Sequence, residues 1–352
     1  MNTRPVVRVV LVNYRDYAGK YLKRCLQSLR EQDFTGKIVI DIIDNEASTE
    51  TGQHIRTSAP EAEYLPFSEN LGFAGACNVG IRRAIRSHDD YVFLLNMDAF
   101  LAPSTVRLLV DYMERNASVG AVQPLILQWP DTTKIDTAGN VVHVLGFGLC
   151  DRFGREPSSV PTTPFPVGYC SGAAVLYRVE ALIEVGELDE DMWMYCEDQD
   201  LGIRLRLFGW ENVCVPFALA YHEHEMGRSQ QKLALIECNR YLFMLKNYHW
   251  ATLAALLPLL AGFELCMLIG SLASRQLRFK LEALRRLFSD GRVRRCLATR
   301  KRVRRRVRSR DKDIFRYVRG NLEYGGFSTW LTVPLTAVCN SYLAALRLVM
   351  RW

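Results

Sequence analysis

The stretch Tyr91-Val92-Phe93-Leu94-Leu95-Asn96-Met97-Asp98 decides most of the fold of this 352-residue chain. Its first five residues are apolar, and an apolar run of this length is typical of a β-strand buried on both faces. Asn96 and Asp98 follow at once, and residues two positions apart in extended backbone project to the same side. The stretch therefore predicts a central strand whose carboxyl end presents an amide and a carboxylate to one ligand.

Two more strands of this kind are predicted on its N-terminal side, at Val6–Tyr14 and Lys37–Asp44. Helical spacing over 18–31 and a glycine-rich helical start over 72–86 separate them. Strands that alternate with helices at this spacing predict parallel pairing and an α/β fold. Further helices are expected over 101–115, 200–208 and 233–250, and further strands over 173–177 and 212–220, with a looser stretch between residue 45 and about residue 65.

Polar side chains gather at the carboxyl ends of the predicted strands, where open parallel sheets bind ligands. Oxygen ligands of this kind suit Mg²⁺ or Mn²⁺ bridging a diphosphate, although Asn and Asp are also ordinary turn formers. A neutral imidazole can complete a metal shell, but a lone histidine at a strand end is more often structural. The strand ends carry Asn13 with Tyr14, Asp44 with Asn45, Asn96 with Asp98, and His222 with His224 nearby.

Two other segments have the composition of functional loops. Asn70 to Gly80 holds three glycines and two asparagines, which suits either phosphate binding at a helix start or tight helix packing. Glu197-Asp198-Gln199-Asp200 precedes a helical run, where acids complement the helix dipole. One of these carboxylates is alternatively a general base, because neighbouring acids raise each other's pKa toward neutral pH.

The order of these motifs resembles family 2 of the inverting glycosyltransferases, which have a GT-A fold. The resemblance spans roughly Val6 to Ser229, and the bacterial rhamnosyltransferase-like enzymes of cell-surface polysaccharide synthesis look most similar. It implies an α/β fold with a Rossmann-like mixed sheet. It rests on Val12-Asn13-Tyr14, Ile43-Asp44-Asn45, Asn70 to Gly75, Leu94 to Asp98, Ser171-Gly172-Ala173, Met194 to Leu201 and His222.

The resemblance also implies a role for each matching residue. Asp98 and His222 are expected to ligate a divalent metal, and Asp198, with Glu197 beside it, is expected to be the catalytic base. The remaining positions are expected to bind substrates: Asn13, Tyr14, Asp44, Asn70, Gly75, Asn78 and Asn96 the nucleotide sugar, and Ser171, Gly172 and Trp193 the sugar pocket.

The implied reaction is a single displacement that inverts the sugar's anomeric configuration. The donor is expected to be dTDP-rhamnose or a UDP-sugar, and the acceptor a polyprenyl-diphosphate-linked saccharide or a glycan. Three segments depart from the family pattern: Asn96 replaces the first acid of a D-x-D motif and Met97 a commoner residue, Cys196 replaces glycine, and Gly186-Glu187-Leu188-Asp189 replaces Gly-Gly-Phe-Asp.

The composition changes near residue 250, so we expect a catalytic domain over 1–250 and a helical, arginine-rich region over 251–352. Residues 275–316 hold 18 of the 45 Lys and Arg residues but only four of the 38 acids, a local balance of +14 in a chain of net charge +7. Apolar segments over 251–274 and 327–349 flank this block, and each is long enough to cross a bilayer.

Crossing would place the basic block outside, against the positive-inside rule. We therefore favour in-plane association with an anionic surface over a spanning or re-entrant hairpin. The flanking apolar segments favour lipid over nucleic acid as the partner of the block. The expected location is the cytoplasmic face of the bacterial inner membrane, since the N-terminus lacks a signal peptide and ten scattered cysteines suit a reducing compartment.

Two other functions stay open at this point. A nucleotidyltransferase can also combine an α/β nucleotide site with acids and Mg²⁺, but it should carry more basic residues near the first strand than Arg15. A membrane-bound scaffold without activity is disfavoured because Asp98, Asp198 and His222 occur together. A homodimer is left open.

Overall fold

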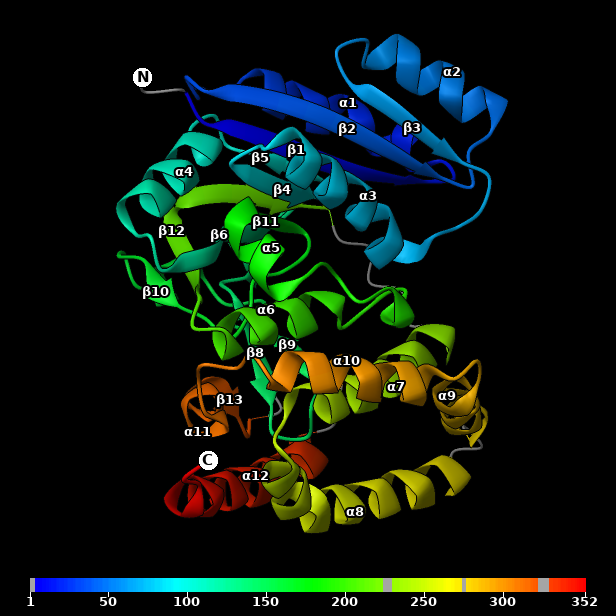
Figure 1. Ribbon diagram of the computed structural model, residues 1–352, viewed down its shortest axis with the longest axis vertical. Coiled ribbons are helices and arrows are strands. Elements are labelled where there is room, and N and C mark those ends of the chain that lie inside the picture. The colour runs from blue at the N-terminus through cyan, green and yellow to red at the C-terminus, as the bar shows by residue number, and fades with distance from the viewer. Residues whose placement is uncertain (1–3, 224–229, 274–276, 322–328) are drawn as a thin grey trace. The chain divides into compact units, whose positions relative to one another are not determined.

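A computed structural model of the protein describes residues 4–223, 230–273, 277–321 and 329–352. The chain forms two compact units, whose elements Figure 1 labels. The first unit is Met1–Asn140, Cys150–Leu205 and Trp210–Glu225, and the second is Val141–Leu149, Arg206–Gly209 and Met226–Trp352.

A mixed sheet forms the centre of the first unit. One half of the sheet is parallel, as the alternation of strands and helices predicts. It is formed by β3 (Glu63–Phe67), β2 (Lys37–Asn45), β1 (Val6–Tyr14) and β4 (Tyr91–Leu95). β11 then runs antiparallel between β4 and β6, so the sheet reverses direction there. Within the described residues it has ten strands: in order β10 (Phe165–Pro166), β12 (Glu211–His222), β6 (Val119–Gln128), β11 (Ala174–Arg178), β4 (Tyr91–Leu95), β1 (Val6–Tyr14), β2 (Lys37–Asn45) and β3 (Glu63–Phe67), with β5 (Ala99–Leu101) on β12 and β7 (Ile135–Thr137) on β6.

Helices cover both faces of this sheet, and the alternation of β1 shows how. Val7, Val9 and Leu11 face a core shared with α1 and α4, while Val10 faces α3 on the other side (Figure 1). A Cβ at Gly80 of α3 would lie 2.3 Å from a Val10 methyl carbon, so glycine permits this close packing. The helices are α1 (Tyr17–Arg30), α2 (Thr49–Ser58), α3 (Gly72–Ser87), α4 (Thr105–Arg115), α5 (Val179–Val185) and α6 (Glu197–Leu207).

Three local expectations need correction. The stretch after residue 45 is ordered as α2 and β3. Ser48 caps α2: its hydroxyl oxygen accepts the Thr51 N–H, and the Thr51 hydroxyl oxygen accepts the Ser48 N–H. Residue 101 ends β5 instead of starting a helix. Glu197 to Asp200 form the first turn of α6 instead of preceding it. Short polar helices carry little apolar periodicity, which is why the pattern missed α2.

A buried ionic cluster lies within the sheet at Arg8, the basic residue inside the apolar run of β1. Its Nη1 lies 2.9 Å from Asp41 Oδ1, and its Nε lies 2.6 Å from Asp89 Oδ2. All three side chains are buried. Arg83 adds a second cation, with its Nε 3.0 Å from Asp41 Oδ2, so the cluster satisfies charges that would be costly to bury alone.

The second unit is mainly helical, with a small sheet in the order β13-β8-β9. It includes α7, which packs with α9 and α10, so the observed division falls ahead of the expected boundary at residue 250. From the sequence, α7 is expected in the catalytic domain because the helix has mixed polarity and lies ahead of the change in composition near residue 250. The elements are α7 (Gln230–Asn247), α8 (Trp250–Ala273), α9 (Leu277–Phe288), α10 (Arg292–Arg304), α11 (Asp311–Ile314), α12 (Thr329–Val349), β8 (Asn140–His143), β9 (Gly148–Cys150) and β13 (Val318–Arg319).

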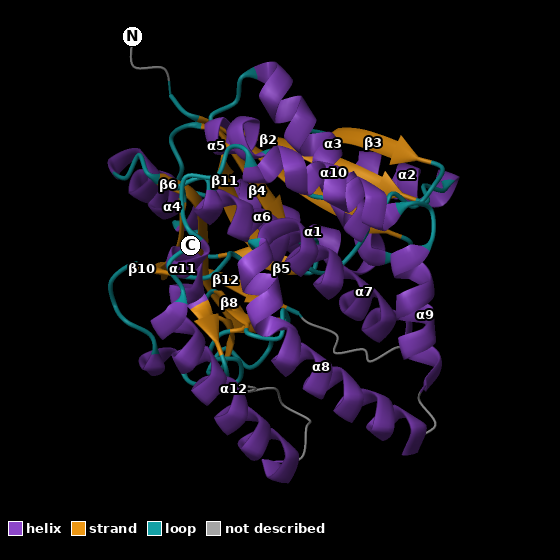
Figure 2. Ribbon diagram, turned by 60° about the horizontal axis from the view of Figure 1, so that its bottom comes forward, coloured by secondary structure: helices purple, strands orange, loops and turns teal. Residues whose placement is uncertain are grey.

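Within the part of this unit that the structure describes, two helices are long and apolar enough to cross a membrane, by length and composition. They contain Trp250–Ser271 and Thr332–Val349, and only 11% and 17% of these windows is buried. Figures 1 and 2 show α8 and α12 on the same side of the other helices of the unit. Residue 274 and residues 327–328, at the ends of the predicted apolar segments, lie outside the described residues.

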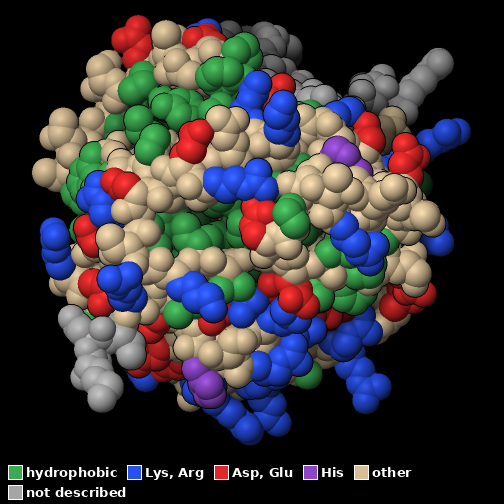
Figure 3. Space-filling model, turned by 90° about the horizontal axis from the view of Figure 1, so that it is seen from above, with side chains coloured by type: hydrophobic (Ala, Val, Ile, Leu, Met, Phe, Trp, Pro, Cys, Tyr) green, Lys and Arg blue, Asp and Glu red, His purple; other side chains and the backbone are tan. Residues whose placement is uncertain are grey.

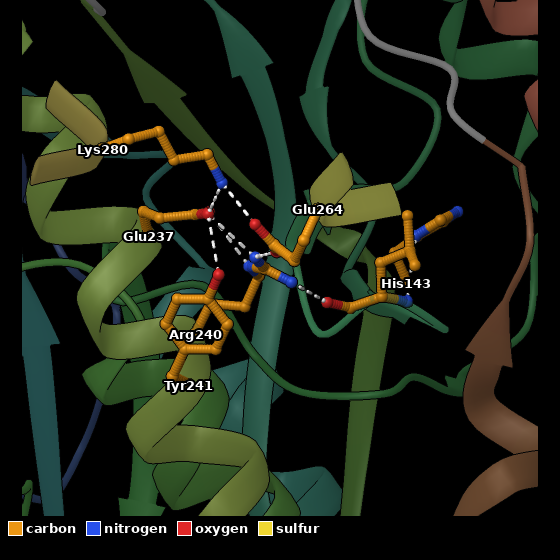
Figure 4. Close-up of polar contacts among 7 residues, drawn as sticks. His143, Glu237, Arg240, Tyr241, Glu264 and Lys280 are labelled. Atoms are coloured by element: carbon orange, nitrogen blue, oxygen red, sulfur yellow. Dashed lines mark hydrogen bonds and ion pairs between the residues drawn. The ribbon is translucent and has the colours of Figure 1, made fainter. Parts of the chain in front are cut away.

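Four charged side chains join α8 to α7 and α9 (Figure 4). Glu264 of α8 accepts hydrogen bonds from Arg240 of α7 and from Lys280 of α9, and both cations also contact Glu237. The Arg240 guanidinium additionally donates to the Leu145 carbonyl at 2.8 Å. Two cations and two carboxylates make this cluster neutral, so it fixes one face of α8 against the unit.

Charge is distributed differently over other parts of the surface. On the face that Figure 3 shows, acidic and basic side chains lie among one another over most of the area. In the second unit, by contrast, basic residues dominate α9 and α10, which fall within the block of 18 Lys and Arg against four acids.

Candidate active site

The carboxyl end of β4 carries the Asn96-Met97-Asp98 segment, as predicted. The Asn96 N–H donates to the Ala173 carbonyl at 2.9 Å, just before β11 begins. Met97 is buried, whereas Asn96 and Asp98 are partly exposed. The antiparallel insertion of β11 therefore brings residues 171–173 to the same edge as the predicted metal ligand.

Asp98 lies beside one ring nitrogen of His222, and Asp136 lies beside the other. Pairing of β12 with β5 aligns His222 with Ala99, so its Nε2 lies 3.3 Å from Asp98 Oδ1. Its Nδ1 lies 3.0 Å from Oδ2 of Asp136 on β7. Burial disfavours a charged imidazole, but the two carboxylates outweigh burial and raise the pKa of His222 to about 10. Nothing local in the sequence singled out Asp136, which lies 86 positions from His222.

This arrangement fits a divalent metal chemically. Asp136 holds Nδ1 and leaves Nε2 directed at Asp98, as carboxylates behind metal-bound histidines do. Among the described residues no group of three or more His, Cys, Asp or Glu side chains is arranged to hold a metal by itself. Asp98 and His222 would therefore share an ion with ligand oxygens, such as those of a diphosphate. His224, the other predicted imidazole, lies outside the described residues.

Asn13 and Asp44 form a contiguous pair at the ends of β1 and β2. Asn13 Nδ2 donates to Asp44 Oδ1 at 2.6 Å, and Asp44 Oδ2 accepts from Tyr64 at 2.8 Å and from Thr51 at 3.1 Å. Both Asn13 and Asp44 are fully buried. Tyr14 beside them is partly exposed. Because the Asp44 side chain is buried, it can contact a nucleobase only if the residues that cover it move aside.

The start of α3 is fixed by Trp193. The Trp193 carbonyl accepts the Ala74 N–H at 3.1 Å, and its indole lies 3.4 Å from the Asn70 carbonyl. Gly72 has φ +70°, and a Cβ there would lie 2.4 Å from the Trp193 carbonyl oxygen. This glycine therefore permits the close approach between Trp193 and the helix start.

In the later part of the glycine-rich segment, the side chain of Asn78 is engaged within the protein. Asn78 is buried; its Nδ2 donates to the Leu188 carbonyl at 3.0 Å and to Glu190 at 2.9 Å, and its Oδ1 accepts the Leu188 N–H. Gly75 is buried inside α3. The amide of Asn78 is thus occupied by the 188–190 segment and is not available to a ribose in this structure.

Asp198 lies beside the β4 edge and is held by backbone amides. Its Oδ2 accepts the Gly172 N–H at 3.0 Å and its Oδ1 accepts the Gln199 N–H at 2.7 Å. Ser171 precedes this contact, and its N–H donates to the buried Gln123 side chain at 2.8 Å. Gln123 is a positioning residue that sequence reasoning missed, because it lies within a strand.

Glu197 and Asp198 differ in their environments. Burial and the charge of Asp198 raise the pKa of Glu197 to about 8, and Glu197 Oε2 has no hydrogen-bond partner among the described residues. Burial also raises the pKa of Asp198, but the two backbone N–H donors oppose that rise. Burial and the neighbouring charge thus favour the neutral form of Glu197, whereas the backbone N–H donors favour the charged form of Asp198, and this difference separates their chemical roles.

The backbone just before this pair is strained. Trp193, Tyr195 and Cys196 have φ of +58°, +70° and +68°, values that non-glycine residues rarely adopt. Glycine at position 196, the residue usual in the resembling family, would adopt this conformation without a Cβ penalty. The strained residues lie immediately before the two acids in the chain.

Comparison with known proteins identifies the family. Residues 8–186, about half of the chain, match the model of "Glycosyl transferase family 2". The chain belongs to this family. It is 31% identical over 261 residues to the N-acetylglucosaminyl-diphospho-decaprenol L-rhamnosyltransferase of Mycobacterium tuberculosis, covering 68% of this chain and 84% of the relative. It is also 24% identical over 218 residues to the rhamnosyltransferase WbbL of Escherichia coli, covering 59% of this chain and 81% of the relative.

Solved structures confirm the predicted GT-A fold. GalNAc-T7 with UDP, GalNAc and Mn²⁺ matches with a TM-score of 0.55 at 14% identity, over 70% of this chain and 48% of that one. The mannosyltransferase PcManGT of Pyrobaculum calidifontis, in complex with GDP-Man and Mn²⁺, matches with a TM-score of 0.51 at 15% identity, over 82% and 89%. This family 2 member is thus a glycosyltransferase with a mixed α/β sheet, which leaves no role for the nucleotidyltransferase alternative.

Proposed function

We propose that this glycosyltransferase moves L-rhamnose from dTDP-rhamnose, with inversion, onto a hydroxyl of a polyprenyl-diphosphate-linked saccharide. The observation that carries this is the convergence, at the end of β4, of the Asp98–His222 pair with the carboxylate of Asp198. The relatives support the sugar and the acceptor class, because two of them are named rhamnosyltransferases and one is named for a diphospho-decaprenol acceptor. A hexose from a UDP-sugar is the alternative donor.

The nucleotide end of the donor would lie over the ends of β1 and β2. Tyr14 is exposed enough to contact a base, and Asn13 orients Asp44 through the 2.6 Å hydrogen bond. Asn70 and the α3 start would lie toward the ribose and diphosphate. We assign Gly75 and Asn78 to the support of this surface, since both are buried in α3 or bonded to its neighbours.

Asp98 and His222 would hold Mg²⁺ or Mn²⁺, with Asn96 beside them. The metal, when bound, neutralises charge on the departing nucleotide diphosphate. Two related folds bind Mn²⁺ together with a nucleotide or nucleotide sugar, which supports this requirement. Asp136 keeps the imidazole oriented so that Nε2 faces Asp98.

Asp198 would remove the acceptor's hydroxyl proton as that oxygen attacks the anomeric carbon. The Gly172 and Gln199 N–H groups hold both carboxylate oxygens, so the base is ordered before the acceptor arrives. Each oxygen keeps a lone pair for the incoming proton. Ser171, Gly172 and Trp193 would border the sugars, because Gly172 touches Asp198 and Trp193 touches the α3 start. One displacement requires no second nucleophile, so the product is inverted.

The acceptor explains the need for a membrane surface. We propose that α8 and α12 lie in the plane of the cytoplasmic leaflet of the inner membrane. Exposed apolar side chains support this: Leu257, Leu265 and Ile269 on α8, and Val333, Val338 and Leu348 on α12.

The ion cluster of Figure 4 favours in-plane association over crossing. Glu264 lies in the middle of α8 and is bonded to α7 and α9 on one side. A crossing helix would carry this acid toward the bilayer centre, away from Arg240 and Lys280, where a charge is expensive. A helix lying flat keeps the cluster intact and turns its opposite, apolar face to lipid.

The decisive experiment compares the full-length protein with Asp198→Asn in the transfer of labelled rhamnose to a lipid-linked N-acetylglucosaminyl diphosphate. Loss of the base should lower kcat by about 10²–10⁴-fold while donor binding is retained. Asp111→Asn, which removes a half-exposed carboxylate on α4, is the matched control and should stay active. Full activity of Asp198→Asn would refute the assignment of the base.

Donor identity is tested separately. dTDP-rhamnose should raise the unfolding temperature of the protein in the presence of Mn²⁺, because a ligand that binds only the folded state stabilises it. UDP-hexoses serve as comparison ligands, and EDTA should abolish the effect. Stronger protection by a UDP-hexose would replace rhamnose as the proposed sugar without changing the assigned base.

A further inference from the structure

A basic hollow lies in the second unit, where α8 begins beside α10. It measures about 480 Å³ and is lined by His249, Trp250, Leu297, Arg300, Lys301, Arg304 and Arg305. Four of these seven side chains are cationic, and none of them is acidic. Its size lies within the range of small-molecule sites, and the site described above does not use it.

Two of the cations are fixed in place by the end of α7. Arg300 donates to the carbonyls of Leu245 and Tyr248, and Arg304 donates to the Asn247 carbonyl at 3.0 Å and to Asp311 at 2.9 Å. These bonds hold both guanidiniums in one position, so their remaining N–H donors are preorganised.

The positive charge at the hollow is only partly compensated. The Asp311 carboxylate is the one anion that these bonds reach, and it also accepts the His249 N–H and the Thr252 hydroxyl. The side chains of Lys301 and Arg305 are exposed, and among the described residues neither forms a hydrogen bond or ion pair. Burial and the neighbouring Arg304 lower the pKa of Arg300, as expected where cations crowd together. The chemistry of this hollow calls for a multiply charged anion.

The apolar part of the lining indicates what carries that anion. Trp250 is 56% exposed at the first residue of α8, and its ring lies 3.9 Å from the Arg300 guanidinium carbon. Leu297 is 40% exposed beside it. Tryptophan at the start of an apolar helix is typical of a membrane interface, where headgroup phosphates lie. A free nucleotide or a nucleic acid would gain nothing from the exposed apolar face of α8.

We propose that this hollow binds the phosphate or diphosphate group of a membrane lipid. Lys301 and Arg305 would close on the phosphate oxygens that Arg300 and Arg304 orient, and Trp250 would lie at the boundary with the acyl chains. The inference rests on the proposed membrane association of α8. The same chemistry is offered by an anionic phospholipid and by the diphosphate of a polyprenyl-linked acceptor.

The test measures binding of the full-length protein to sedimented vesicles. Lys301→Gln/Arg305→Gln removes two hollow charges but keeps the two arginines that support α7. Arg294→Gln/Arg302→Gln is the matched control, because both are exposed residues of α10 outside the hollow lining. The vesicles contain phosphatidylcholine alone, or with phosphatidylglycerol, or with a trace of a polyprenyl diphosphate.

The hollow variant should bind about 30-fold more weakly than the wild type, as expected for two lost cation–phosphate contacts. The control should weaken binding no more than about threefold. Selective loss with phosphatidylglycerol identifies a bulk phospholipid, and selective loss with the polyprenyl diphosphate identifies the acceptor's anchor. If both variants lost binding equally to the phosphatidylglycerol vesicles and to the polyprenyl diphosphate vesicles, the proposed site would be overturned. That result would show only a diffuse attraction between basic residues and the anionic surface.

The result is independent of the transfer reaction. Asp198→Asn should bind all three vesicles like the wild type, since the base takes no part in lipid contact. If the hollow variant and the control variant lost binding equally while rhamnosyl transfer stayed normal, only the lipid site would be rejected. If the hollow variant alone lost binding but the protein transferred no sugar, only the proposed function would be rejected.

Discussion

Replacing Glu197 by glutamine should make the protein more stable at neutral and alkaline pH. Glutamine has the size and neutrality of the protonated acid, which is the form that the buried site favours. In the unfolded chain the carboxyl titrates near 4.5, whereas burial and Asp198 raise its pKa to about 8 in the folded protein. Between these values the unfolded chain releases a proton that the folded chain keeps.

The free energy of unfolding therefore falls as pH rises from about 4.5 to about 8, and it levels off above. Each pKa unit corresponds to about 1.4 kcal/mol. The wild type should lose roughly 1 kcal/mol by pH 5, about 3 kcal/mol by pH 7 and at most about 5 kcal/mol by pH 9 through this group. The Glu197→Gln variant lacks this loss, and titrating groups that do not interact with Glu197 cancel in the difference between the two proteins; the adjacent Asp198 is coupled to Glu197 and contributes to that difference.

Urea unfolding at pH 5, 7 and 9 measures the difference directly, as a gap between midpoints that widens with pH. Glu69→Gln, at an exposed residue, is the control and should give a constant gap. Parallel curves for Glu197→Gln and the wild type would show that Glu197 is ionised in the folded protein. Glu197 would then compete with Asp198 as the base, and the separation of their roles would be refuted.

Three other substitutions probe the site and its frame. Asp136→Asn should weaken metal affinity about 10–100-fold by releasing the orientation of His222, measured as metal-dependent thermal stabilisation; unchanged affinity would exclude a supporting role. Gly80→Ala should destabilise by about 1–3 kcal/mol, because its Cβ overlaps Val10, and a neutral effect in urea unfolding would contradict that packing. Arg8→Met should cost about 3–5 kcal/mol by removing the cation beside buried Asp89 and leaving buried Asp41 with Arg83 alone, and wild-type stability would show that water reaches these carboxylates.

Local patterns predicted the parallel half of the sheet well. β1, β2 and β4 are apolar runs buried on both faces, and their polar ends lie at one edge as parallel pairing requires. The β4 stretch was informative because the strand is buried on both faces of the sheet, so every one of its side chains must be apolar. Family resemblance added the family itself, which the family match over residues 8–186 confirms.

What the sequence could not show depends on contacts between distant positions. Asp136 finds His222 only because β7 and β12 both pair with β6. Asn78 meets Leu188 across 110 positions, and no periodicity reports such a pairing. The antiparallel placement of β11 is equally non-local. For these reasons the strand ends were predictable while the residues that support them were not.

The hairpin Val141–Leu149 has a consequence for how this protein can evolve. It lies in the chain between β7 and β11 of the catalytic unit, yet it folds with the C-terminal helices and supplies Leu145 to Arg240. A gene fragment encoding residues from 226 onward would lack this piece of its own core. Recombination at a single breakpoint between residues 149 and 226 would therefore separate the hairpin from the helices with which it folds, so we expect the helical unit to be exchanged intact only when the hairpin moves with it.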